Sequence, residues 1–115
     1  MSKLASIDDQ KKLVITYRVE GGCLGPEGHN HIVNFCDYAQ ANIDNASADF
    51  LTLNIVPRLD KTLPEMQFNI LSKKVTYAQA EKYLSYFGQN LEDFESQLSD
   101  ELTKLIREYV GKYLR

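Results

Sequence analysis

The C-terminal part of the chain carries an apolar stripe that predicts one long helix, and this stripe constrains the fold more than any other feature. Its members recur at steps of three or four residues: Leu91, Phe94, Leu98, Leu102, Leu105, Tyr109 and Tyr113. That spacing places them on one face of an α-helix. Asn90 precedes the stripe as an N-cap, and Glu92 and Asp93 follow it, where the helix dipole favours acids. The pattern therefore predicts a helix over residues 91–114.

The length of this helix limits how it can be accommodated. It spans roughly 36 Å at about 1.5 Å per residue, whereas a compact domain of 115 residues is only ~35 Å across. The helix must therefore cross the whole domain or project from it. A projecting end would need cover for Leu102, Tyr109 and Tyr113, and a symmetric homodimer is the commonest way to provide it. The alternative is a helix that packs along the body of its own chain.

Alternation of apolar and polar residues predicts three strands upstream of this helix. The strands cover residues 13–20, 50–56 and 66–70, where apolar side chains fall at every second position. Apolar residues at helical spacing after Asn30, which would be the N-cap, predict a helix between the first two strands. Thr76 and Gln79 match a capping box that opens another helix, which should run to Phe87 and stop at Gly88.

The predicted elements follow the order strand, helix, strand, strand, helix, helix, which indicates an α+β fold. The first crossover makes strands one and two parallel, and the connection over residues 57–64 makes strands two and three an antiparallel hairpin. We therefore expect a two-layer sandwich with a small mixed three-stranded sheet and a long C-terminal helix. Residues 11–115 should form a single domain after a polar, flexible N-terminus at residues 1–10.

Composition narrows the classes of partner and the cellular location. The net charge is −3, which argues against nucleic acid and against an anionic membrane surface as the main partner. No apolar run approaches the ~18 residues that a membrane span needs, and residues 1–10 lack the apolar segment of a signal peptide. The sequence therefore predicts a cytoplasmic protein, in which a Cys23–Cys36 disulfide is not expected.

The residues best suited to chemistry are concentrated in one segment between the first strand and the helix that follows it. Both cysteines, both histidines and four of the six glycines lie between Gly21 and Cys36. Cys23, His29 and His31 are ligand types suited to zinc, whereas the helical phase of Cys36 places it in the core. The competing interpretation is that the glycines make turns and the histidines are exposed.

The same loop allows two other kinds of site. The candidate ligand-binding residues are Gly22, Cys23, Gly25 and Gly28, whose backbone N–H groups would face a small molecule. A phosphate is disfavoured, because no lysine or arginine lies between Val19 and Pro57. Cys23 would act as a nucleophile only if His29 or His31 folded back as its base. A third group that orients this base would also be needed, for which Glu27 and Asp37 are the candidates, and we assign no catalytic residue.

No motif carries a resemblance to a known family, so a function is inferred from these patterns alone. The first hypothesis is a non-enzymatic protein-interaction module that self-associates as a homodimer through its C-terminal helix. Its interface would include Leu102, Tyr109 and Tyr113, since tyrosine is enriched at interfaces. The alternative is a protein that binds a metal or a small ligand in the loop of residues 21–31. Zinc is the only cofactor considered.

Overall fold

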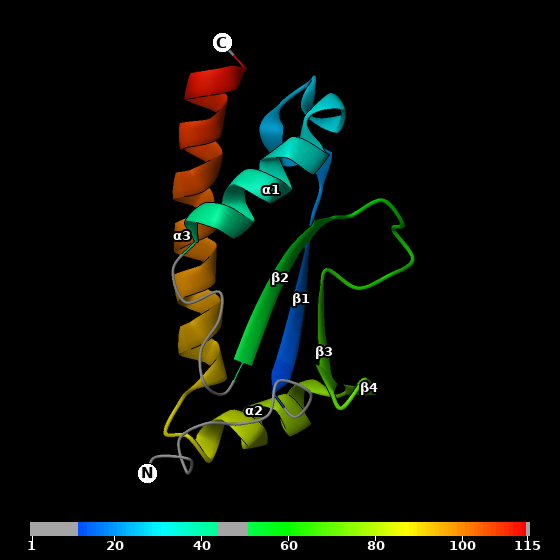
Figure 1. Cartoon of the computed structure of the whole chain (residues 1–115), viewed down its shortest axis with the longest axis vertical. Helices are drawn as coiled ribbons and strands as arrows, with labels where there is room; N and C mark the ends of the chain where they lie inside the picture. The colour runs from blue at the N-terminus through cyan, green and yellow to red at the C-terminus, as the bar shows by residue number, and fades with distance from the viewer. Residues whose placement is uncertain (1–11, 44–50, 115) are drawn as a thin grey trace.

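The computed structural model describes residues 12–43 and 51–114 and shows strands and helices in this part of the chain (Figure 1). The strands are β1 (Leu13–Val19), β2 (Leu51–Pro57), β3 (Met66–Ile70) and β4 (Lys73–Val75). The helices are α1 (Ile32–Asn42), α2 (Tyr77–Ser85) and α3 (Leu91–Tyr113). Two short 3₁₀ turns, η3 (Gly21–Leu24) and η4 (Gly28–Asn30), lie between β1 and α1. The N-terminus predicted to be flexible, residues 1–10, lies outside the described residues.

The described strands form one mixed sheet in the order β2-β1-β3-β4. β1 pairs with β2 in parallel, as the crossover through α1 predicts, and it pairs with β3 antiparallel, with Tyr17 opposite Met66. The predicted hairpin between β2 and β3 is therefore wrong, because β1 lies between them. The connection that follows β2 passes the end of β1, where the N–H of Arg58 donates to the carbonyl of Val19 at 2.8 Å.

The sheet has a fourth strand, so the predicted count of three is also wrong. β4 pairs antiparallel with β3, and Val75 lies opposite Phe68. Leu71 and Ser72 form the two-residue turn between the strands, with φ of 53° and 65°. Three residues, Lys73–Val75, are too few to show alternation. Neither turn residue is the asparagine or glycine that positive φ favours, so the local sequence gives no sign of this hairpin.

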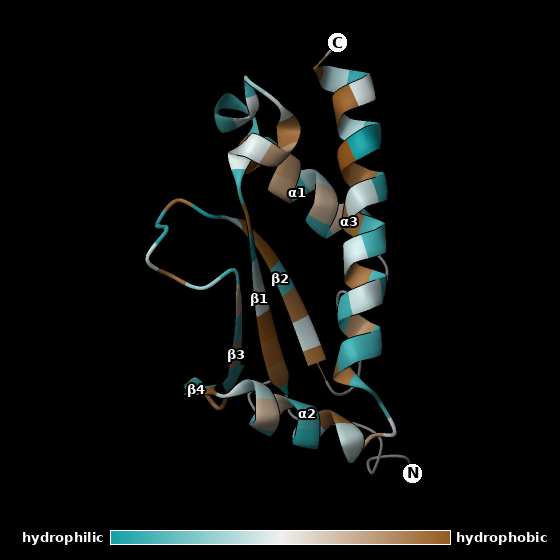
Figure 2. Cartoon of the chain, turned by 180° about the vertical axis from the view of Figure 1, so that it is seen from behind, coloured by the Kyte–Doolittle hydropathy of each residue, from teal (hydrophilic) through white to brown (hydrophobic). Residues whose placement is uncertain are grey.

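The described helices and the mixed sheet confirm the predicted α+β class and the long C-terminal helix. α1 contacts both β2 and α3, and α2 lies across the end of the sheet (Figure 1). Hydrophobic residues are concentrated on β1 and β2, as Figure 2 shows. The buried core joins Leu13, Ile15, Leu53 and Ile55 of these strands to Phe35, Ala39, Leu98 and Leu102 of the helices.

The opposite face of the sheet is polar. Thr16 of β1 lies between Asn54 of β2 and Gln67 of β3 in the strand register. None of these three side chains is buried. Alternation of apolar and polar residues along a strand is typical of a sheet with one packed face and one solvated face.

α3 runs along the long axis of the molecule (Figure 1). Its 23 residues extend about 34 Å within a longest dimension of 49 Å. Asn90 caps the helix as predicted, since its side chain accepts from the N–H of Asp93 at 3.0 Å. α1, α2 and η3 all contact α3, so the helix packs along the body of its own chain. None of the helices that the structure describes is long and apolar enough to cross a membrane.

Local capping chemistry sets the boundaries of α2. Thr76 and Gln79 form the predicted capping box, in which the N–H of Gln79 donates to Thr76 Oγ1 at 3.1 Å and the N–H of Thr76 donates to Gln79 Oε1 at 2.9 Å. The helix ends at Ser85 rather than at the predicted Phe87. The chain then turns at Gly88, which has a φ of 70°. The predicted stop signal is therefore present, although the helix ends before it.

The start of α1 departs from the prediction. Asn30 belongs to η4, and its side chain donates to the Glu27 carboxylate at 3.3 Å. His31 occupies the N-cap position and makes no side-chain cap bond. A 3₁₀ turn therefore leads directly into the helix, and the expected Asn30 cap is wrong because its amide is engaged within the loop.

Candidate functional site

The segment that holds both cysteines and both histidines folds as a compact loop closed by its own backbone. Gly21 and Gly28 are both buried, and a methyl group on Gly28 would overlap the carbonyl oxygen of Gly21. A methyl group on Gly21 would likewise meet His29, whose Nδ1 lies 2.8 Å from that position. Leu24 is buried in the same loop. These two glycines therefore permit the close approach of η3 and η4, which is a packing role.

The three predicted zinc ligands differ in their exposure, and zinc binding stays a prediction. Cys23 and His29 are exposed, and His31 is half-buried. No group of three or more His, Cys, Asp or Glu side chains that could hold a metal ion occurs in residues 12–43 and 51–114. A side chain at Gly22 or Gly25, which were predicted to contact a small ligand, would enter open space. At Gly22 and Gly25 the loop therefore does not enclose a ligand site.

The two thiols lie in different environments. Cys36 is buried, as its helical phase predicted, and burial followed by the charge of Asp37 raises its pKa to about 12. Cys23 is exposed and lies near Tyr17, whose pKa is raised by burial, by Glu65 and by Cys23. Cys36 is therefore a protonated core residue, whereas a nucleophilic role for Cys23 stays a prediction.

Two of the three predicted interface residues lie inside the chain. Leu102 and Tyr109 are each only 5% exposed, and the Tyr109 ring packs edge-on against Phe35 with 5.4 Å between centroids. Tyr113 is 58% exposed and lies beside Tyr38, with 6.2 Å between the ring centroids. Of the three, only Tyr113 lies where a second molecule can reach it, and the homodimer stays a prediction.

The two outer edges of the sheet are built differently, and the edge at β2 is closed. Gln40 of α1 lies over it: Nε2 donates to the carbonyl of Leu53 at 2.9 Å, and Oε1 accepts from the N–H of Ile55 at 2.7 Å. The amide thus takes the place of a neighbouring strand. Pro57 ends β2 and has no N–H to offer. Because unpaired N–H and C=O groups at an edge invite another strand, the Gln40 amide blocks strand addition at Leu53 and Ile55.

The opposite edge is open over the first part of β3. The β4 register ends with Val75 opposite Phe68, and the chain then enters α2. Backbone groups of successive residues point to opposite sides of a strand, and the carbonyl of Glu65 accepts from the N–H of Arg18 on the β1 side at 2.7 Å. The N–H and C=O of Met66 therefore face the open edge, where no described strand lies beside them.

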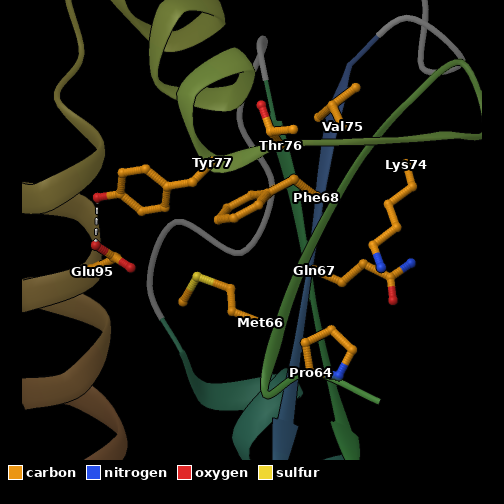
Figure 3. A pocket seen from close by; sticks show the side chains of 9 residues that line it. All are labelled: Pro64, Met66, Gln67, Phe68, Lys74, Val75, Thr76, Tyr77 and Glu95. Atoms are coloured by element: carbon orange, nitrogen blue, oxygen red, sulfur yellow. Dashed lines mark hydrogen bonds between the residues drawn. The ribbon is translucent and has the colours of Figure 1, made fainter. Parts of the chain in front are cut away.

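A hollow of about 380 Å³ lies at this open edge (Figure 3). Its lining combines apolar side chains, from Pro64, Met66, Phe68 and Val75, with polar ones, from Gln67, Lys74, Thr76, Tyr77 and Glu95. Met66 and Phe68 pack against the core, whereas Gln67 belongs to the polar face. The hollow therefore wraps around the edge of β3 and is bordered by both faces of the sheet.

A hydrogen-bonded pair bounds the helix side of the hollow. The Tyr77 hydroxyl donates to Glu95 Oε2 at 2.8 Å, and the Tyr77 ring packs edge-on against Phe68 with 5.8 Å between centroids. The hydrogen bond to Glu95, followed by burial and the charge of Glu95, raises the pKa of Tyr77 to about 12. The phenol is therefore protonated at neutral pH, and it holds the first turn of α2 against α3.

The polar side of the hollow carries positive charge. Lys74 lies there beside Gln67 (Figure 3), and no carboxylate pairs with Lys74 within the described residues. Arg18 donates from Nη2 to Gln67 Oε1 at 3.0 Å and from Nη1 to the carbonyl of Pro64 at 2.7 Å. The guanidinium therefore fixes one wall of the hollow. The pKa of Asp60 is lowered by hydrogen bonds from Thr62 and, less strongly, by the charge of Arg18, so this carboxylate partly offsets the guanidinium.

The loop over residues 58–65 stands beside the hollow and extends away from the sheet (Figures 1 and 2). Arg58 holds it, since this side chain pairs with Glu20 at 2.7 Å and donates to the carbonyl of Leu63 at 3.1 Å. Leu59 in the same loop is 77% exposed. A single exposed apolar side chain is common on protein surfaces, so Leu59 by itself does not define a binding surface.

Comparison with protein-family models, with curated proteins and with solved structures found no match to this chain. The candidate site therefore rests on the geometry of the β3 edge. Sequence reasoning missed it, because its residues come from several separate elements and none of them carries a motif. The one local signal is the pair Lys73 and Lys74 just before the capping box, since lysine is common on exposed edge strands.

Proposed function

We propose that this chain is a protein-interaction domain that binds its partner at the hollow beside β3. The observation that carries the proposal is the open edge at Met66, where a backbone N–H and C=O face a hollow instead of a neighbouring strand. Backbone groups at a sheet edge are a common means of binding an extended segment of another protein.

The contrast with β2 supports this choice of surface. A bare edge is a liability that promotes unwanted pairing, and proteins usually guard it. Gln40 guards β2 with two hydrogen bonds. On the other side of the sheet, the short β4 and its lysines protect the end of β3, but no described residue forms a backbone hydrogen bond with Met66 on the open side. An edge that is left open beside a lined hollow is better explained by a binding partner than by chance exposure.

The lining of the hollow and its surroundings also favour a protein partner. Binding sites combine an apolar floor with a few polar groups that set orientation, and here Met66 and Phe68 lie between Lys74 and the Tyr77–Glu95 pair. The neighbouring loop exposes Leu59. This apolar side chain would extend the contact beyond the hollow.

Selection from a random peptide library displayed on phage tests the proposal. We expect wild-type protein to enrich a family of related peptides, and we expect Pro64→Trp, which fills the hollow from an exposed position, to lose them. Val33→Trp is the matched control, because Val33 is an exposed residue of α1 that does not line the hollow. Failure to enrich peptides, or equal enrichment by both variants, would overturn the proposal.

The other functional expectations stay predictions. Self-association through α3 is tested by sedimentation of wild type against Tyr113→Glu, since Tyr113 is the exposed member of the predicted interface. The cytoplasmic location is likewise untested by the fold. Metal or ligand binding in the loop of residues 21–31 gains no support from the packing of Gly21 against Gly28.

A further inference from the structure

We infer that the partner enters the hollow as an extended strand in which a central apolar residue is flanked by acidic ones. This inference rests on the proposed function and specifies the chemistry of the partner. It is built from three features of the site: the backbone groups available at Met66, the side chains on the helix side of β3, and the charges on its polar side.

The backbone groups favour an extended segment but allow only a short ladder. A residue placed opposite Met66 can exchange two hydrogen bonds with it, as in an antiparallel pair. The next edge residue along the chain toward the loop is Pro64, which has no N–H, and its carbonyl already accepts from Arg18 at 2.7 Å. The ladder is therefore confined to one pair, so side chains must supply most of the selectivity.

The helix side of the hollow selects the central residue. Directly opposed residues of paired strands place their side chains on the same face of the sheet, so the residue opposite Met66 points toward Phe68 and Tyr77. Glu95 closes this side and already accepts a hydrogen bond from Tyr77 at 2.8 Å. An acidic side chain would be repelled there, whereas an apolar side chain adds to the core contacts of Met66.

The polar side of the hollow selects the flanking residues. The neighbours of the central residue point to the opposite face of the sheet, where Gln67 and Lys74 line the hollow. Arg18 lies on the same face and contacts Gln67 at 3.0 Å. Acidic flanking side chains would pair with Lys74, which has no carboxylate partner within the described residues, whereas lysine or arginine would be repelled by it.

Two other occupants fit the geometry less well. A helical segment uses its own N–H groups internally and would leave the Met66 groups without partners. The β2 edge of a second copy is engaged by Gln40 at Leu53 and Ile55 and ends at Pro57, which disfavours its addition to β3 in a head-to-tail contact. Both occupants are outcomes that the test below distinguishes.

Titration of ¹⁵N-labelled protein with two blocked pentapeptides tests the inference. The first is acetyl-Thr-Asp-Ile-Asp-Thr-amide, and the second replaces both aspartates with lysine. We expect the acidic peptide to produce the largest amide shift at Met66 and to bind at least about fivefold more tightly than the basic peptide, which is the scale of one exposed ion pair. Transferred nuclear Overhauser effects should report an extended bound peptide.

A pair of charge variants separates the role of Lys74 from that of net charge. We expect Lys74→Glu to abolish or reverse the preference for the acidic peptide. Lys104→Glu makes the same charge change on an exposed turn of α3 and should keep the preference. Met66→Pro removes the N–H at the first residue of a strand, where proline is tolerated, and should weaken binding of the acidic peptide to a folded protein.

The outcomes distinguish this inference from the proposed function. If the peptide library yields peptides that need the hollow but are helical, basic or indifferent to Lys74→Glu, the interaction domain stands and the strand inference is overturned. If the acidic pentapeptide shifts no amide of β3, or if binding is unchanged in both Lys74→Glu and Met66→Pro, the inference is overturned as well. Self-association that shifts the Met66 amide when the protein is concentrated without peptide would assign the edge to a second copy and also overturn the inference.

Discussion

Each edge of the sheet has backbone N–H and C=O groups without a neighbouring strand, and the two edges differ in what lies beside these groups. At β2, a side chain from the covering helix α1 replaces the missing neighbour, with hydrogen bonds of 2.9 and 2.7 Å from the Gln40 amide. At the other edge, a short hairpin strand covers only the end of β3 and leaves Met66 beside a hollow. One edge is closed by a side chain, and the other is partly covered by backbone.

The open edge is a consequence of helix capping. Thr76 follows β4 and immediately becomes the N-cap of α2, through its bonds with Gln79. A chain that caps a helix at this residue cannot also extend the strand to lie opposite Met66. The position of one capping box therefore sets the length of β4 and creates the hollow.

The largest expected effect comes from opening the closed edge. We expect Gln40→Ala to lower the free energy of unfolding by about 1–3 kcal/mol, because it leaves the Leu53 carbonyl and the Ile55 N–H without their partner. The exposed edge should also promote association at high protein concentration. Urea denaturation measures the first effect, and sedimentation velocity measures the second.

Two control variants show whether the amide itself closes the edge. Gln40→Glu keeps an acceptor for the Ile55 N–H but places a carboxylate oxygen against the Leu53 carbonyl, so it should not restore the stability lost in Gln40→Ala. Asn34→Ala removes a similar group from an exposed position of α1 and should change little. An equal loss in Asn34→Ala and Gln40→Ala would show that the helix, and not the edge contact, is responsible.

A smaller effect on stability is expected at the two-residue turn that joins β3 to β4. Leu71 and Ser72 have φ of 53° and 65°, a conformation that is costly for residues with a side chain. We expect the double variant Leu71→Asn/Ser72→Gly to raise the free energy of unfolding by about 1 kcal/mol, because Asn-Gly is favoured in such turns. Thermal denaturation measures the change.

Ser96→Gly is the control for this variant. Ser96 is an exposed residue within α3, where glycine should cost about 0.5 kcal/mol. A loss of stability in the double variant would mean that the turn does not favour positive φ at residues 71 and 72. That result would contradict the observed β3–β4 hairpin.

The smallest expected effect is on the pKa of Tyr77, which lines the hollow. Because the bond to Glu95 is the first cause of the raised Tyr77 pKa of about 12, Glu95→Gln should lower that pKa toward the ordinary value near 10. ¹³C NMR of the tyrosine ring measures it. Glu81→Gln removes a weaker charge contribution and should lower the pKa less; an equal or larger drop would contradict the assigned hydrogen bond.

The same pKa shift predicts how stability depends on pH. The pKa of Tyr77 is higher in the folded chain than in the unfolded chain, so its contribution to stability is fully present below about pH 10. That contribution is lost as pH rises through about 12. Glu95→Gln should weaken this dependence in the alkaline range, as measured by urea denaturation at increasing pH.

Much of the fold was predictable because its signals are local. The capping residues Thr76 and Asn90 and the stripe of α3 depend on neighbours within a few positions along the chain. The order of the strands was not predictable in the same way. Placing β1 between β2 and β3 depends on contacts between residues far apart in sequence, such as Tyr17 and Met66.

The candidate site was harder to predict than the fold. The loop with Cys23, His29 and His31 drew attention through its composition, yet its buried glycines serve backbone packing. The hollow at Met66 exists because of where β4 stops, and a three-residue strand gives no periodic signal. The role of Gln40 was equally hidden, because a single polar residue on a helix does not reveal which strand edge it reaches.

Amide hydrogen exchange at Ile55 and Met66 tests the contrast between the edges most directly. We predict that the Ile55 amide, which donates to Gln40 at 2.7 Å, is protected, and that the Met66 amide exchanges faster by on the order of 100-fold or more. In Gln40→Ala, the Ile55 amide should lose its protection while that of Met66 is unchanged. Equal protection of the two amides in the wild-type chain would contradict the open edge, and with it the binding site proposed at β3.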